Sequence, residues 1–529
     1  QPLLDRVHWV HAADILETAC VVADTPGLYP VYLTSFLCSP DSMTIEYFKR
    51  ILDERGKPYL ILQLDDHDST LGYETRVEAG VASFRNHMGR DAAKAAAAAA
   101  AHAGTQTGGA GEAGTQTAAG VLSVIPRTSA RLDGRTLLFP VWDPLVNPLL
   151  AANLRREGID ARVLSEDPLV IRKSMRHNTG QCLPLNVIVQ EAMDYVRGHG
   201  LVPSATSLWI PHSLLSCNFG MFPSYMKSVF EAEGMGGLQV YRGDMYYLDI
   251  SLRATLNAYR AFLVGGLLRR VGCRLRPYEK VPGATDEAIR RAMQTLIPAF
   301  EGQGSKVQAY REAAAWFATV SVADAPRRPK VAVFGDIYVR DNDVMNQGLV
   351  HAIEAAGGEV LTTPYTEYVR IVAHAYFQKL LESGDRLKSL GYRALWKLVD
   401  TVGRDCRAPF EPYLDPEPAM DAAHNQELVQ AFGLRTEHAG ESFDNLLKIA
   451  HLASAYPDLE LFVQASPSFC CPSLVTEAMA RDIEKRTGVP VVSITYDGTG
   501  QYRNDSVVPF LKLARERGRA SVPSASRAG

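Results

Sequence analysis

The chain of 529 residues has 47% hydrophobic and 22% charged residues and a formal net charge of −4, a composition typical of soluble globular proteins that is long enough for several domains. The slightly negative charge excludes a general attraction to nucleic acid or to acidic membranes, and eight cysteines are too few for a disulfide scaffold. The sequence has no apolar run long enough to span a bilayer and no export signal, so we expect a cytoplasmic protein.

Short β-branched runs alternate with helical patterns along the chain. A strand at 31–37, a helix at 41–55 and a strand at 58–64 come first. Further strands are predicted at 137–141, 207–210, 330–334, 459–464 and 489–495. Strands separated by helices are typical of parallel sheets with right-handed crossovers. We therefore predict an α/β fold of several Rossmann-like lobes, whose parallel sheets are flanked by helices, with a helical insertion at 376–430.

One low-complexity segment divides the chain. Residues 92–120 are nearly all Ala, Gly, Thr and Gln, which cannot bury enough apolar surface to offset the entropy of ordering. We predict a disordered linker over 91–130, in which the alanine block forms helix only transiently. The linker separates a partial α/β lobe at 1–90 from α/β lobes at 131–323 and 324–529. The chain starts without Met, so the first lobe is expected to be the tail of a preceding module.

An internal repeat surrounds two of the cysteines. The segments around Cys38 and Cys470 both run strand, Cys-x-Pro, helix, Gly, strand and acid. Cys38 is 27 positions before Asp65, and Cys470 is 27 positions before Asp497. The shared layout predicts two copies of one βαβ unit.

The Cys-x-Pro motif occurs three times, at Cys38, Cys182 and Cys470, and a helix is predicted to begin at or just after each proline. A thiol before a helix start lies at the positive end of the helix dipole, which favours the thiolate that binds iron. Cys217 also stands between a predicted strand and a helix, and Gly220 after it permits a close backbone approach. These four cysteines are the predicted ligands of a metal centre.

The competing interpretation of each cysteine is a small buried hydrophobic side chain. It is favoured for Cys20, Cys273 and Cys406, which lack the motif. Cys471, next to Cys470, is a further candidate ligand whose role stays open. The sequence has no C-x₂-C pair of the kind that binds zinc, whereas widely separated cysteines suit an iron–sulfur cluster held between lobes.

At these cysteines the sequence resembles the large activase-related proteins of the 2-hydroxyacyl-CoA dehydratase superfamily, which includes double-cubane-cluster reductases. The resemblance covers most of the chain outside the linker and follows the family order. It is carried by FLCSPDS at 36–42, LQLDDHDSTLGYETRVEA at 62–79, GQCLPLNVI at 180–188, SCNFGMFPSY at 216–225, RPYE at 276–279, GDIYVRDND at 335–343, AGES at 439–442, SPSFCCPS at 466–473 and TYDGTG at 495–500.

The resemblance implies an anaerobic, cytoplasmic protein of Rossmann-like lobes with a [4Fe–4S] or double-cubane cluster between them. Its implied ligands are Cys38, Cys182, Cys217 and Cys470, and its implied partner is an ATP-hydrolysing activase that delivers low-potential electrons. The chain departs from the family at Asn218, where the family pattern has Arg. It also has no G-x-x-x-x-G-K-[ST] loop, so nucleotide chemistry is expected in a partner or in another module.

Other polar residues follow predicted strands, and each has a structural alternative. The cluster at 65–68 is expected to be either a pocket or interface element or a solvated acidic loop; it consists of Asp65, Asp66, His67 and Asp68. Two roles are considered for Tyr338, Arg340 and Asp341: orienting a substrate or a partner, or forming a structural salt bridge. Glu441 caps a helix or takes part in catalysis, and the segment 276–279 is expected to be a packing corner rather than a catalytic element.

Three functions are compatible with the sequence. The first is a cluster-bearing reductase or dehydratase component that acts on a small molecule, and the second is a non-catalytic scaffold that docks an activase. The third is a metal-free α/β binding module. A homo-oligomer is expected, without nucleic-acid or membrane partners.

Overall fold

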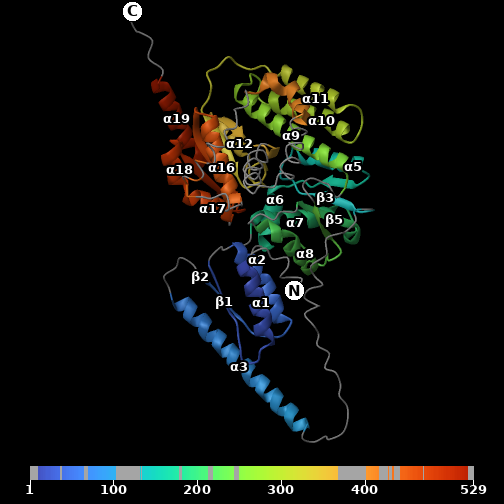
Figure 1. The fold of residues 1–529 in the computed structure, drawn as a ribbon, viewed down its shortest axis with the longest axis vertical. Coiled ribbons are helices and arrows are strands. Elements are labelled where there is room, and N and C mark those ends of the chain that lie inside the picture. Colours follow the sequence, from blue (N-terminus) through green and yellow to red (C-terminus); the bar gives the residue numbers. More distant parts are fainter. Residues whose placement is uncertain are drawn as a thin grey trace, which may run out of the picture.

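The fold comes from a computed structural model that describes most of the chain. The described residues are 10–35, 39–64, 70–102, 132, 134–177, 182–211, 218–243, 250–366, 401–415, 427, 430, 432–433, 441–468 and 470–521. They form three units, each with its own parallel sheet (Figure 1). We call them the N-terminal unit (10–102), the middle lobe (134–319) and the C-terminal lobe (330–521).

The N-terminal unit has two parallel strands between helices. Its elements are α1 (Val10–Asp24), β1 (Val31–Ser35), α2 (Ser39–Asp53), β2 (Leu60–Leu64) and α3 (Leu71–His102). In Figure 1 the strands lie between α1 and α3. Tyr32 of β1 packs edge-on against Phe48 of α2, and Phe84 of α3 stacks on Tyr29 with ring centroids 4.8 Å apart.

Helix α3 extends into the segment that was predicted to be a disordered linker. It continues through the alanine block to His102, so 91–102 are helical in the structure. Alanine has the highest helix propensity, and a helix already started at Leu71 extends at little cost. The rest of the predicted linker, 103–130, lies outside the described residues.

The middle lobe contains a four-stranded parallel sheet in the order β4-β3-β5-β6. Its strands are β3 (Thr136–Phe139), β4 (Asp160–Val163), β5 (Thr206–Pro211) and β6 (Gln239–Gly243). Its helices are α5 (Asn147–Arg156), α6 (Pro168–Ser174), η2 (Met175–His177), α7 (Leu183–Gly198), η3 (Pro203–Ala205), η4 (Asn218–Met221), α8 (Phe222–Ala232), α9 (Leu252–Leu275), η5 (Arg276–Tyr278), α10 (Ala284–Phe300), α11 (Lys306–Ala315) and η6 (Trp316–Thr319).

The C-terminal lobe repeats this architecture with the strand order β10-β9-β7-β8, also parallel. Its strands are β7 (Lys330–Gly335), β8 (Glu359–Thr362), β9 (Leu459–Pro467) and β10 (Val491–Tyr496). Its named helices are α12 (Leu349–Ala355), η7 (Ala408–Tyr413), α16 (Glu441–Ala455), α17 (Cys471–Ala478), α18 (Ala480–Thr487), η8 (Asn504–Val507) and α19 (Val508–Ser521).

Both faces of each larger sheet are buried, as parallel sheets require. In β3, Leu137 and Phe139 join the core that contains residues of α5 and α9, whereas Leu138 joins the core with α7 and α8. In β7, Phe334 and Val333 divide in the same way between two cores. This alternation confirms the predicted α/β fold of parallel sheets flanked by helices.

The internal repeat is also present in three dimensions. The first copy is β1-α2-β2, and the second runs from β9 through α17 and α18 to β10. Both copies pair their strands in parallel. Of the predicted insertion at 376–430, residues 401–413 are helical, and most of the remainder lies outside the described residues.

Candidate functional site: cysteines and the lobe interface

The two described Cys-x-Pro cysteines sit where the sequence predicts. Cys182 is the N-cap residue of α7 and Cys470 that of α17, each followed by a proline in the first turn, and both are buried. Helices α2 and η4 likewise begin directly after Cys38 and Cys217. Cys38 and Cys217 themselves lie outside the described residues.

The loop after β10 links the surroundings of Cys182 and Cys470. The Ser468 N–H, two residues before Cys470, donates to the carbonyl oxygen of Tyr496 at 3.0 Å. On the other side, a Cβ on Gly498 would lie 3.2 Å from Leu183, the residue after Cys182. The two cysteines therefore flank one loop at the boundary between the middle and C-terminal lobes. The helices that follow the other two candidate ligands also contact each other: α2 begins after Cys38 and η4 after Cys217.

The environment of Cys470 suits a sulfur that carries negative charge. Its Sγ accepts a hydrogen bond from the Ser473 hydroxyl at 3.2 Å, inside the first turn of α17. The N-terminus of a helix adds a partial positive charge at the same place. Cys471 is the first residue of α17 and is half-buried.

The cysteines without the motif have different surroundings. Cys273 and Cys406 are packed inside hydrophobic cores. Burial raises the pKa of Cys273 to about 12 and that of Cys406 to about 11, which keeps both as thiols. Cys20 is half-buried on α1, packed against the core. The structural role expected for these cysteines is supported.

A complete metal site is not contained in the described residues. Among them, no three or more His, Cys, Asp or Glu side chains are arranged to hold a metal ion. Two of the four predicted ligands, Cys38 and Cys217, fall outside this part of the chain, as do the acids at 65–68 and the side chain of Glu441.

The loop after β7, which carries Tyr338, Arg340 and Asp341, joins the two lobes. The Tyr338 hydroxyl donates to Glu166 Oε2 of the middle lobe at 2.6 Å. Asn342 Nδ2 donates to the same oxygen at 2.7 Å and to the carbonyl oxygen of Val141, also at 2.7 Å. Tyr338 therefore takes part in the contact between the middle and C-terminal lobes.

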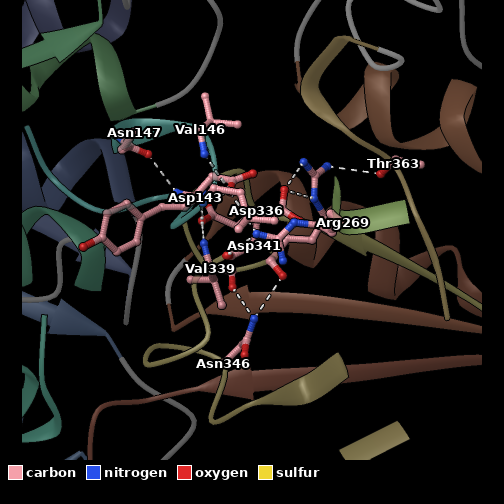
Figure 2. Close-up of polar contacts among 12 residues, drawn as sticks. Asp143, Val146, Asn147, Arg269, Asp336, Val339, Asp341, Asn346 and Thr363 are labelled. Atoms are coloured by element: carbon pink, nitrogen blue, oxygen red, sulfur yellow. Dashed lines mark hydrogen bonds and ion pairs between the residues drawn. The ribbon is translucent and has the colours of Figure 1, made fainter. Parts of the chain in front are cut away.

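A buried cluster of charges lies beside this contact (Figure 2). Arg269 of α9 donates to Asp143 Oδ1 at 3.0 Å and to the backbone oxygen of Asp341 at 3.2 Å. Arg340 donates to Asp341 Oδ2 at 2.6 Å and to the hydroxyl of Thr363 at 3.2 Å. Arg269, Arg340 and Asp341 are each less than 9% exposed. The structural salt bridge, one of the two alternatives for Arg340 and Asp341, is therefore present.

For both acids of this cluster, burial raises the pKa and the nearby arginines lower it, but the net result differs between the two. Burial raises the pKa of Asp143, and the charge of Arg269 only partly offsets it. For Asp341, burial is outweighed by Arg340 and Arg269, so its pKa is lowered. Asp341 is consequently more firmly ionised than Asp143.

The segment 276–279 is a packing corner, as expected. Arg276 donates to both carboxyl oxygens of Glu354, at 2.8 and 3.0 Å, which ties the end of α9 to α12. The Tyr278 hydroxyl donates to Glu359 at 2.5 Å, and the Glu279 carboxylate accepts from backbone N–H groups at the start of α10. All of these contacts are structural.

Four residues beside the lobe contact were not predicted from the sequence: Asp143, Glu166, Glu191 and Arg269. The available signal for Glu191 was weak: a glutamate inside the apolar run of α7, whose residues from Leu183 to Met193 are all buried. Arg269 meets partners more than 70 residues away on both sides. No local pattern marks such a residue.

Neither a protein-family model nor a curated protein matches the chain. In the part of the chain that the structure describes, no helix combines the length and the apolar character needed to cross a bilayer.

Proposed function

We propose that this chain is an iron–sulfur protein of the 2-hydroxyacyl-CoA dehydratase superfamily that acts in low-potential electron transfer or substrate reduction. The observation that carries the proposal is the pair of buried thiols, Cys182 and Cys470, each at the start of a helix and both flanking the loop at Gly498. The ordered motifs of the sequence support the same assignment.

The described donors fit such a group. Thiolates are the usual ligands of iron–sulfur clusters, and helix N-termini favour the thiolate form. The hydrogen bond from Ser473 to Cys470 Sγ is of the kind that tunes cluster potential. Cys38 and Cys217 are the other proposed ligands, and Cys471 is an additional candidate. A [4Fe–4S] or double-cubane cluster bound there would supply one-electron transfer.

The proposed electron source is an ATP-hydrolysing activase, as a separate domain or subunit of a cytoplasmic, anaerobic system. The resemblance to the superfamily implies this partner, and the sequence itself has no phosphate-binding G-x-x-x-x-G-K-[ST] loop. The proposed acceptor is a small molecule.

The test begins with protein purified without oxygen. We expect iron and acid-labile sulfide in the protein and a paramagnetic resonance signal after reduction. Cys182→Ser and Cys470→Ser should each lose most of the iron. Cys273→Ser is the matched control, because Cys273 is equally buried but lies within α9 rather than at a helix start, and it should keep the iron.

Two results would contradict the proposal. One is colourless wild-type protein with negligible iron and sulfide, which would favour the metal-free binding module. The other is full iron content in both Cys182→Ser and Cys470→Ser. Iron-loaded protein that never turns over small substrates with a reduced activase would instead indicate the non-catalytic scaffold.

A further inference from the structure

Glu191 is a buried carboxyl group that no described residue hydrogen-bonds. It lies in the middle of α7 and is 3% exposed, and among the described residues neither of its carboxyl oxygens has a hydrogen-bond partner. The charged groups that act on it are Glu166 and Asp167, and both are acidic. Because a buried carboxylate without a partner is very costly, Glu191 is held as the neutral acid.

Glu166 is near enough to Glu191 to act on it electrostatically, and it forms the contact with the C-terminal lobe. Its Oε2 accepts from the Tyr338 hydroxyl and from Asn342, whereas its buried Oε1 has no hydrogen-bond partner among the described residues. Burial raises the pKa of Glu166 to about 7, against the hydrogen bonds from Tyr338 and Asn342. Burial, with the nearby charge of Glu166, raises the pKa of Glu191 well above its ordinary value.

The described elements around the two acids supply no balancing cation. On the start of α6, the Asp167 carboxylate accepts from the helix N–H groups of Leu169 and Val170. From the loop after β7 come Tyr338 and Asp336, and Asp336 in turn accepts from backbone N–H groups of its own loop. Lys173 of α6 pairs with Asp194 of α7 at 3.2 Å. Within the described residues, no Lys, Arg or His forms an ion pair with Glu166 or Glu191.

We propose that Glu166 and Glu191 bind protons as a pair and thereby control the contact between the middle and C-terminal lobes. With both acids neutral, the lobe interface stays closed around them. Loss of the protons places two like charges in a buried space, which favours a state in which the lobes part and water reaches the carboxylates. This inference does not depend on the proposed function.

The direction of the pH dependence follows from the raised pKa values. The closed state binds more protons than the open state, in which the carboxyl groups have their ordinary pKa of about 4.5. The contribution of these protons to closure is therefore complete below about pH 4.5, and it is lost as the pH rises from there towards about 7, the pKa of Glu166 in the closed state. Each coupled proton should raise the opening equilibrium about tenfold per pH unit in this interval, so two protons give about a hundredfold.

Hydrogen exchange of the whole chain tests the proposal. Exchange of peptides covering 183–198 and 336–346 is measured from pH 5.5 to 6.5, corrected for the intrinsic exchange rate, under conditions in which reclosing outpaces exchange. Wild-type exchange should rise about a hundredfold over this unit, and Glu191→Gln should reduce the rise to about tenfold. Glu166→Gln combined with Glu191→Gln should abolish it. Asp194→Asn, on the same helix but partly exposed, should behave like wild type.

Wild-type exchange that does not change with pH, or a Glu191→Gln variant as pH-sensitive as wild type, would overturn the proposal. Infrared difference spectra of the wild-type protein give a second measurement that needs no variant. A protonated-carboxyl stretch should disappear as the pH rises through neutrality, and its absence at pH 6 would also overturn the proposal. Restoration of protection at pH 8.5 by added Mg²⁺ or Ca²⁺ would show a cation site instead.

Discussion

Gly335 fixes the start of the loop that carries the lobe contacts. It ends β7 with φ +124°, in the region that side chains rarely adopt, and a Cβ there would overlap the carbonyl oxygen of Ala465 on β9. The neighbouring Asp336 N–H donates to that same oxygen at 2.9 Å. The close approach of the two backbones therefore sets the direction in which Tyr338 and Arg340 leave the sheet.

Gly335→Ala should destabilise the protein by about 2–5 kcal/mol, from backbone strain and from overlap with a backbone atom that cannot move aside. Urea unfolding followed by fluorescence measures the loss. Gly72→Ala is the matched control, because no described atom outside its immediate neighbours and its own helix backbone lies within 4 Å of the added methyl group, and α3 favours alanine, so its stability should not fall. A loss of less than about 1 kcal/mol for Gly335→Ala would show that β7 and β9 can separate locally.

Single residues were predictable where local chemistry decides their position. The helix starts after Cys182 and Cys470 follow from proline in the first turn, which lacks the N–H that a helix start leaves unpaired. Glu191 was not predictable, because its burial arises from packing of α7 against segments distant in sequence. Its sequence neighbours suit either a buried or a half-exposed helix.

The distinction between local and long-range determinants also explains which strands were predicted from the sequence. The strands predicted from sequence include all of the central ones, β3, β5, β7 and β9. The missed strands are β4, β6 and β8, and each is an edge strand of its sheet. Edge strands carry polar residues such as Asp160 and Arg162, since one long side of the strand lacks a neighbouring strand. Their apolar signal is correspondingly weak.

Helix α9 illustrates how a long element is fixed at its start. Ser251 is its N-cap, and the Ser251 hydroxyl accepts from the Ala254 N–H at 2.9 Å and donates to Glu157 at 3.2 Å. Ser251→Ala should cost about 0.5–2 kcal/mol, measured by urea unfolding. Ser305→Ala at α11 should cost less, because its cap bond to Gln308 is 3.5 Å long. Equal losses would show that cap geometry does not govern these helix starts.

At the scale of the whole molecule, polar groups join the two larger lobes beside the shared core. The Tyr338–Glu166 hydrogen bond, the Arg276–Glu354 ion pair and the contacts of Arg269 with Asp341 all cross between them. Each joins segments more than 70 residues apart, so the sequence predicted two α/β lobes but not their contact residues. Buried ion pairs add little stability over apolar packing, but breaking one is costly. Such contacts hold one relative placement of the lobes.

Arg269 gives the clearest test of this arrangement. Arg269→Met would leave Asp143 and Asp341 facing each other in a buried space without their shared cation, and Arg340 would remain to balance only one of them. We expect a loss of about 3–5 kcal/mol in the urea unfolding free energy. Arg269→Lys should recover only part of it, because an ammonium cannot bond two partners in the geometry of a guanidinium.

The control is Arg253→Met, which removes an arginine of the same lobe whose side chain is 58% exposed in its pair with Glu157, and which should leave the unfolding midpoint close to that of wild type. Loss of the lobe contact should also make the two lobes unfold in separate transitions, because each lobe has a parallel sheet of its own. If Arg269→Met unfolds at the wild-type midpoint in one transition, the charge cluster does not hold the lobes together. The relative placement of the lobes would then rest on the apolar residues of the shared core, which include Leu183 of α7 and Tyr496 of β10.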